Sequence, residues 1–250
     1  MNLLALWIPS HTSTENLQFF LRVVHYAAAI VWVGLLYFFN LVNVPFMKTV
    51  TDPTVKKNVF QNMTLPALNW FRWSALVTVF VGGWYWAQTI VAVDAHNAAA
   101  AGISGASAGK AIGIFVGLWT LAWAVEFGII SSGAKVAVLN KGLVYGMLVA
   151  IVIVAASWGF VALHSDGWES NRLVCIGIGG GMGWFLMLNV WGIIWRSNKK
   201  IIKGALAGTP PSDGPRLARQ AFLASRTNMW LSVPLLFFMA AASHYPLFGK

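Results

Sequence analysis

Two histidines stand inside apolar stretches, where an imidazole side chain is unexpected. His25 lies near the start of VVHYAAAIVWVGLLYFF, Val23 to Phe39, and His244 lies near the end of the last apolar run, Met229 to Leu247. Neutral imidazole is a good ligand for haem iron and for copper, and an ionisable side chain at membrane depth is a functional candidate by default. The pair therefore predicts a metal-centred cofactor, haem b first and copper as the alternative, with both rings as metal ligands.

Two further residues join this candidate cofactor site. His164 follows the fourth apolar run, where it is either an alternative ligand or a hydrogen-bond partner for a haem propionate. Trp32 lies seven residues after His25 and shares a helix face with it, so it either walls a cofactor site or simply packs. His11 and His96 flank the apolar runs and are expected to bond backbone carbonyls or lipid headgroups. The sequence singles out no catalytic residue.

The composition indicates whether water or lipid surrounds these residues. Of the 250 residues, 58% are hydrophobic and only 10% are charged, more apolar surface than a soluble domain of this length can bury. The chain is therefore predicted to be an integral membrane protein in contact with the lipid bilayer. We predict a single all-α membrane domain over residues 1–250, a polytopic transmembrane bundle of about six spans.

Six apolar runs approach the roughly 20 residues that a spanning helix needs. A short interfacial segment, residues 1–16, precedes the first run, and a basic cytoplasmic loop, residues 196–228, separates the last two. The small-residue stretch AHNAAAAGISGASAGK, Ala95 to Lys110, is predicted to be a loop. The runs are Leu17 to Val44, Leu68 to Val93, Ala111 to Ser131, Leu143 to Leu163, Leu173 to Trp195 and Met229 to Leu247.

The distribution of charge predicts the orientation of the bundle. The formal charge is +10, and most of the 17 Lys and Arg residues lie in the loops after the first, third and fifth runs. Basic residues clustered in alternate loops are typical of membrane topology, so nucleic acid is excluded as a partner and both termini are predicted to lie outside, in a bacterial inner (cytoplasmic) membrane. His25 is then about 12 Å deep from the outer side, and His244 about 6 Å from the outer boundary.

Other features within the runs each have two interpretations. Glu126 either relays protons or pairs with Arg72. The segment GIGGGMG, Gly177 to Gly183, allows close approach of either another helix or a flat macrocycle. GPRLARQAFLASR, Gly214 to Arg226, either lies on the inner membrane surface or leads as a helix into the sixth run. Pro234 is expected to kink that helix or to start it afresh.

The last third of the chain carries the most specific pattern: MLNVWGIIW, then ALAGTPP, then ASRTNMWLSVPLLFFMAAASHYP. Together with HYAAAIVWVGLLYF and NWFRWSALVTVFVGG, it resembles the membrane domain of bacterial membrane-bound urate oxidase, the kind that carries a C-terminal cytochrome c. The resemblance spans most of the chain. The matched positions are His25, Trp32, Gly34, Arg72, Gly179, Gly183, Asn189, Ser225, Asn228, Pro234, His244, Tyr245 and Pro246.

The resemblance implies a multi-helix membrane domain that passes electrons from purine oxidation to a cytochrome c. The sequence ends at Lys250 without a cytochrome c tail, so the electron acceptor is expected to be a separate periplasmic cytochrome c. Two positions depart from the family pattern: Gly177 stands where the family carries a histidine, and Thr227 stands where it often carries another. The alternative hypothesis is a cofactor-free accessory subunit of a larger respiratory or photosynthetic membrane complex.

Overall fold

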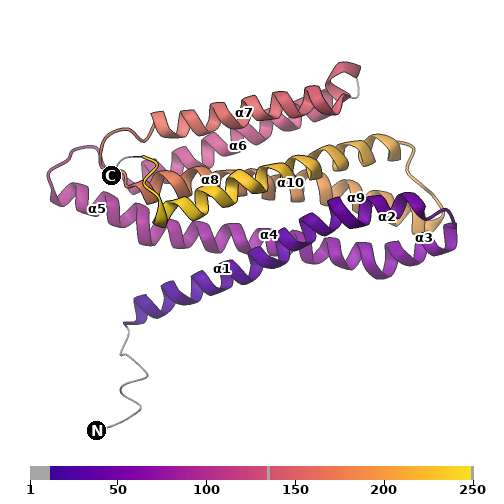
Figure 1. Cartoon of the computed structure of the whole chain (residues 1–250), viewed down its shortest axis with the longest axis horizontal. Helices are drawn as coiled ribbons and strands as arrows, with labels where there is room; N and C mark the ends of the chain where they lie inside the picture. Colours follow the sequence, from indigo (N-terminus) through magenta and orange to yellow (C-terminus); the bar gives the residue numbers. More distant parts are fainter. Residues whose placement is uncertain (1–11, 134–135, 249–250) are drawn as a thin grey trace, which may run out of the picture.

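Backbone polar groups in an apolar solvent must bond within their own segment, so long apolar runs are expected to be helical. The computed structural model describes residues 12–133 and 136–248, and within them it contains only helices and short connections (Figure 1). The helices line up as six antiparallel columns. In chain order these are α1 (Ser13–Tyr37), η2 (Phe38–Asn43) and α2 (Val44–Thr49); α3 (Pro53–Val59), η3 (Phe60–Thr64), α4 (Leu65–Trp86), η4 (Ala87–Val91) and α5 (Ala92–Ala100); α6 (Ala108–Ser132); η5 (Ala137–Asn140) and α7 (Gly142–Ala162); α8 (Asn171–Asn189), η6 (Val190–Trp195) and α9 (Arg196–Ala207); and α10 (Gly214–His244).

The predicted fold class is confirmed. Among the described residues, the first five columns are long and apolar enough to cross a membrane, so the chain is a multi-pass membrane protein. The sixth column, α10, is the longest single α-helix of these residues, but its first half carries Arg216, Arg219 and Arg226. Its second half, which contains most of the predicted sixth run, lies beside α8.

The antiparallel order places both ends of the described chain at the same end of the bundle (Figure 1). The start of α1 and the end of α10 lie at one end of the bundle, which we call the outer end. The connections after the first, third and fifth columns lie at the opposite end, which we call the inner end. These are the basic connections of the sequence, so the names follow the positive-inside rule.

Three boundary predictions have clear outcomes. The predicted loop Ala95 to Lys110 is wrong at both ends, because helix α5 continues to Ala100 and α6 begins at Ala108. Alanine is the best helix former, so the four consecutive alanines extend the helix where their small size suggested a loop.

At the inner end, residues 214–226 form the first half of α10, which confirms the predicted helix that leads into the sixth run. Helix α10 continues through Pro234 and does not start afresh there. Most of the predicted interfacial segment, residues 1–11, lies outside the described residues.

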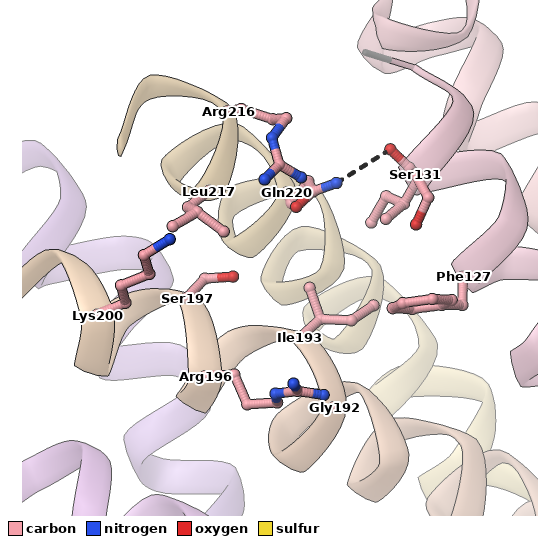
Figure 2. Close-up of a pocket in the computed structure, with 11 residues that line it drawn as sticks. Phe127, Ser131, Gly192, Ile193, Arg196, Ser197, Lys200, Arg216, Leu217 and Gln220 are labelled. Atoms are coloured by element: carbon pink, nitrogen blue, oxygen red, sulfur yellow. Dashed lines mark hydrogen bonds between the residues drawn. The ribbon is translucent and has the colours of Figure 1, made fainter. Parts of the chain in front are cut away.

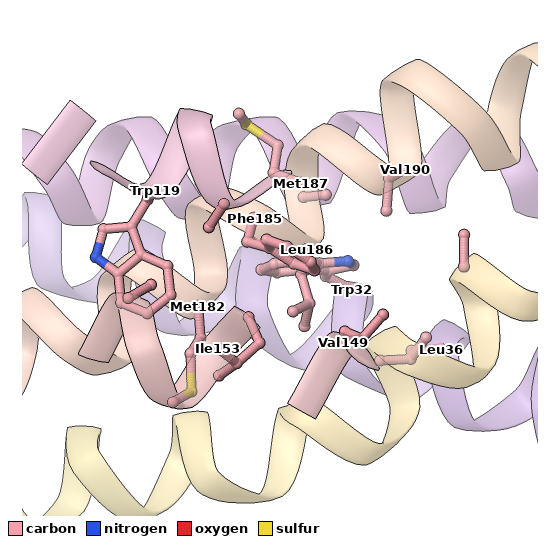
Figure 3. Packing of buried hydrophobic residues seen from close by; sticks show 14 of the residues in the cluster. Trp32, Leu36, Trp119, Val149, Ile153, Met182, Phe185, Leu186, Met187 and Val190 are labelled. Carbon is pink, nitrogen blue, oxygen red and sulfur yellow. The ribbon is translucent and has the colours of Figure 1, made fainter. Parts of the chain in front are cut away.

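Helix α8 forms the centre of the core. Most of its side chains are buried, and two of its glycines admit aromatic rings from the neighbouring helices. A Cβ atom at Gly181 would lie 1.8 Å from the Trp119 ring of α6, and one at Gly177 would lie 2.2 Å from the Phe160 ring of α7. Aromatic rings of this chain therefore occupy the space on the side of α8 that carries Gly177 and Gly181, which we call the glycine face. Figure 3 shows Trp119, Phe185 and Leu186 among the buried side chains of this core.

Candidate functional site

His25 is a half-buried residue of α1 in the outer half of the bundle, and its side chain faces α4. Its Nδ1 atom donates a hydrogen bond of 2.8 Å to the backbone carbonyl of Thr78. Its ring lies against the backbone of α4 at Gly82, where a Cβ atom would come within 2.5 Å of the ring. Because a carbonyl can only accept, this bond fixes a proton on Nδ1. In the neutral form of the ring, the Nε2 lone pair is then left for another partner. Histidines that ligate metals commonly have their second nitrogen held in this way.

Arg22 stands one helical turn outward from His25 and was not singled out by the sequence. Its Nη2 atom donates to the hydroxyl of Tyr85 at 2.5 Å, and its guanidinium lies 5.2 Å from the centre of the Tyr85 ring. The contact joins α1 to α4 just as the contact of His25 with Thr78 does. The spacing of Arg22 and His25, three residues apart on one helix, is the sequence signal that could have indicated a cation beside the imidazole.

His244 is exposed at the outer end of α10. The Tyr37 hydroxyl of α1 bonds the Ser232 hydroxyl of α10 at 2.8 Å, which fixes the register of these two antiparallel helices. Counting twelve residues outward from this contact leads to His25 on α1 and to His244 on α10, each about 18 Å away. The two histidines therefore lie at nearly the same level. They have different surroundings, because His25 faces α4 whereas His244 is open.

The backbone around His244 is held by Asn171, another residue that the sequence did not indicate. The Asn171 amide at the start of α8 donates to the carbonyls of Ala242 and Tyr245, each at 3.2 Å. Its oxygen accepts from the backbone amides of Leu247 and Phe248 at 2.9 and 3.1 Å. These four bonds fix the turn that follows α10.

His164 lies beyond the end of α7, away from the contact of α1 with α4. It is buried, its Nδ1 atom donates to the Phe160 carbonyl at 2.9 Å, and its ring stacks on the Phe160 ring with centroids 4.1 Å apart. Burial lowers the pKa of His164, so the ring is neutral at neutral pH. Its Nε2 atom is buried and has no hydrogen-bond partner among the described residues.

The remaining predicted positions are dispersed. Trp32 is 3% exposed and packs in the main core, and its indole nitrogen has no hydrogen-bond partner among the described residues. His96 is exposed on α5, and His11 lies outside the described residues. Over residues 12–133 and 136–248, no three His, Cys, Asp or Glu side chains are close enough to share a metal ion. The structure thus brings His25 and His244 to one level without joining the predicted residues into one cluster.

A second group of polar residues lies in the inner half of the bundle, and we call it the buried polar network. The Tyr145 hydroxyl of α7 donates to the Glu126 carboxyl of α6 and accepts from the Thr227 hydroxyl of α10 at 3.2 Å. Beside this group, Asn189 of α8 donates to Asn228 of α10 at 3.1 Å. The network is completed by Trp123, whose indole donates to Asn189 at 3.1 Å, and by the Leu186 carbonyl, which accepts from Asn228 at 3.0 Å.

Arg72 is engaged elsewhere, so the predicted pairing of Arg72 with Glu126 is wrong. Its guanidinium lies 3.9 Å from the ring centre of Trp195 and 5.1 Å from that of Trp191. Its Nε atom donates to the Asn69 side chain at 3.1 Å. Tryptophan is the strongest aromatic partner for a cation, and these rings satisfy the charge without a carboxylate.

A pocket of about 330 Å³ opens at the inner end, between α6, the η6–α9 segment and α10 (Figure 2). Its floor is apolar, and its rim carries three basic side chains and two serines. Gln220 closes one side by donating to the Ile130 carbonyl at 3.5 Å. The residues that define the floor and the basic rim are Phe127, Ile130, Ile193, Arg196, Lys200 and Arg216.

Comparison with known proteins gives one match. The model of a protein family described as urate oxidase N-terminal matches residues 53–250. The matched part contains the buried polar network, the inner pocket, His164 and His244, whereas His25 and Trp32 precede it. No curated protein and no solved structure matches the chain.

Proposed function

The chain belongs to the urate oxidase N-terminal family, and from this premise we propose that it is a membrane electron-transfer protein. It binds haem b near the outer ends of its helices and passes electrons to a separate periplasmic cytochrome c, in the inner membrane of a bacterium. The observation that carries the proposal is the geometry of His25. This imidazole at membrane depth donates through Nδ1 to the Thr78 carbonyl, and in its neutral form it leaves Nε2 as a lone-pair donor.

The donor set at the outer end fits a haem in three respects. His25 supplies an oriented imidazole nitrogen, the ligand type that haem iron uses most widely. His244 lies at nearly the same level on α10 and would supply a second imidazole nitrogen to hold the haem. Arg22, one turn outward from His25, supplies a cation of the kind that pairs with a carboxylate such as a haem propionate.

Two positions where the resembling family carries histidine do not fit a ligand in this chain. The space next to Gly177 is filled by the Phe160 ring, which would lie 2.2 Å from any Cβ atom there. Thr227 is already bonded to Tyr145 in the buried polar network. Any haem must therefore be held by other residues, and this favours the outer histidines over the glycine face of α8.

Each residue has a separate part in this proposal. Bound haem supplies one-electron transfer, which is the chemistry of the cofactor itself. The Thr78 carbonyl keeps the His25 proton on Nδ1, and Gly82 leaves the room that the ring needs to reach that carbonyl. Asn171 holds the turn after α10 and thereby fixes the position of His244. His164 stays neutral in its buried position and is the alternative to His244 as a nitrogen donor.

The test is an absorption spectrum of the full chain purified from membranes of cells supplied with haem. We expect a Soret band that is lost or strongly shifted in His25→Ala and unchanged in His96→Ala, the exposed control on α5. Separate His244→Ala and His164→Ala variants identify the second ligand, because only one of them should change the spectrum. A folded chain with no haem absorption would contradict the proposal and would favour a cofactor-free accessory subunit.

A further inference from the structure

Glu126 is a fully buried carboxyl group with no cation beside it. Its side chain is 0% exposed, and no ion pair within residues 12–133 and 136–248 includes it. One carboxyl oxygen accepts from the Tyr145 hydroxyl, and the other, Oε2, has no hydrogen-bond partner among the described residues. A buried, unpaired carboxylate is costly in a low-dielectric interior, which favours the neutral, protonated acid.

Among the described residues, the side chains next to Glu126 are uncharged, and Arg219 and Arg226 of α10, which also packs on α6, lie 5.7 and 5.4 Å from the Phe222 ring centre. Tyr145 faces it from α7, Asn189 lies beside it on α8, and Thr227 of α10 reaches it through the Tyr145 hydroxyl. The short elements η4 and η5, which also contact α6, carry no charged residue. Among the side chains named above, Tyr145 is therefore the titratable group that contacts Glu126.

The inner pocket begins one helical turn below Glu126. On α6, Ile130 of the pocket floor follows Glu126 by four residues, about 6 Å. Ile193 of the floor follows Asn189 by the same interval on the fifth column. Ser131 and Ser197 place hydroxyls at the pocket wall, and Figure 2 shows both residues facing the same space. Water at the inner end is thus separated from Glu126 by a short distance along two of the helices that hold the network.

We propose that Glu126 is a proton-binding site within the membrane domain, loaded from water at the inner end through this pocket. In the loading step, the carboxylate takes a proton from water or a hydronium ion to become the neutral acid. In the reverse step, the proton returns to water in the pocket. Tyr145 keeps its own proton and its hydrogen bond throughout, so it orients the carboxyl group. The inference goes beyond the proposed haem function and does not depend on it.

The first test is infrared spectroscopy of the purified full chain in lipid nanodiscs. We expect a carbonyl stretch of a protonated carboxylic acid that disappears as the pH is raised and is absent in Glu126→Gln. Glu169→Gln is the matched control, because Glu169 is a buried glutamate of the outer end, and it should leave this band in place. Tyr145→Phe keeps the carboxyl group and should shift the band, which gives a readout even if Glu126→Gln fails to fold.

Two results would overturn the proton site. One is the absence of this band from the spectrum at every pH. The other is a band that stays constant across the pH range and does not shift in deuterated water.

The second test addresses the route. Ser131→Cys, at the pocket wall, and Ser132→Cys, its exposed neighbour outside the pocket, are each labelled with a bulky maleimide, and the native Cys175 is buried. Labelling Ser131→Cys should slow deuterium exchange at the Glu126 band, whereas labelling Ser132→Cys should not. Equal exchange rates in the two labelled proteins would overturn entry through the pocket.

Discussion

The outer and inner halves of the bundle both hold polar side chains at membrane depth, but the hydrogen bonds of these side chains go to different kinds of partner. In the outer half, His25 and His164 each donate to a backbone carbonyl and keep a second ring nitrogen available. In the inner half, Tyr145, Asn189 and Asn228 bond to side chains of other helices. Side chains oriented by the backbone can accept a ligand without disturbing the fold. Side chains bonded to one another hold the helices in register, so they are expected to contribute more to stability.

The largest effect is expected where the two halves meet, at Gly181 on α8. A Cβ atom there would lie 1.8 Å from the Trp119 ring, so Gly181→Leu should displace the ring and overpack the core. We expect a loss of about 3 kcal/mol in stability, measured by thermal unfolding in detergent. The matched control is Gly180→Ala, where the nearest atom would be 3.6 Å away. Equal unfolding temperatures for the two variants would show that α8 does not join the halves through this contact.

Much of the fold was predictable because the membrane restricts the secondary structures and the topologies that a chain can adopt. Apolar runs must be helices, basic loops alternate with nonbasic ones, and these two rules give the columns and their antiparallel order. The level of a residue along its helix was predictable for the same reason. Counting along apolar runs placed His25 and His244 at similar depths, and the Tyr37–Ser232 contact supports that estimate.

The partners of each side chain were not predictable, because a helix that is apolar all round does not reveal its rotation about its own axis. Glu126 and Arg72 lie at compatible depths, yet Glu126 faces Tyr145 whereas Arg72 faces Trp195. Asn171 was missed for a related reason: its four bonds go to the backbone of a distant segment, which leaves no pattern in the sequence around it.

The inner half should lose more stability than the outer half when one polar residue is removed. Asn228→Leu keeps a similar volume but removes the partner of the Asn189 amide and the donor to the Leu186 carbonyl. We expect a loss of about 2 kcal/mol, since buried groups are left without hydrogen bonds. Asn62→Leu, at an exposed position on η3, is the control and should stay within about 0.5 kcal/mol of the parent. If both variants unfold at the same temperature, the buried polar network does not stabilise the bundle.

A smaller effect is expected at the outer half, where Gly82 faces His25. Gly82→Ala puts a Cβ atom within 2.5 Å of the imidazole, so the ring must rotate and lose its bond to the Thr78 carbonyl. We expect a loss of about 1 kcal/mol, the typical net contribution of one hydrogen bond, together with a shifted Soret band in the haem-loaded protein. Gly83→Ala is the neighbouring control, because a Cβ atom there meets nothing within 4 Å. Identical spectra for the two variants would mean that the contact with α4 does not orient His25.

The smallest effect is expected from the exposed ion pairs at the two ends. Asp213 bonds Lys200 and Arg216, each at 2.8 Å, whereas Asp166 bonds Lys110 at 3.3 Å. The hydrogen bond from Lys200 is the main cause that lowers the pKa of Asp213, and Arg216 adds to it. Above the ordinary value of about 3.9, Asp213 is ionised in both the folded and the unfolded chain, so its stabilising contribution is fully present. Below that value the unfolded chain takes up the proton first, and the contribution is lost as the pH falls through the folded pKa.

Asp213→Asn should therefore differ least from the parent at acid pH and most at neutral pH, as judged by unfolding temperatures across the pH range. A double-mutant cycle with Lys200→Gln isolates the pair. The corresponding cycle of Asp166→Asn with Lys110→Gln should give a smaller coupling, because that pair has one longer contact between two exposed side chains. A larger coupling energy for Asp166 and Lys110 than for Asp213 and Lys200 would contradict the expectation that polar contacts stabilise the inner half more than the outer half.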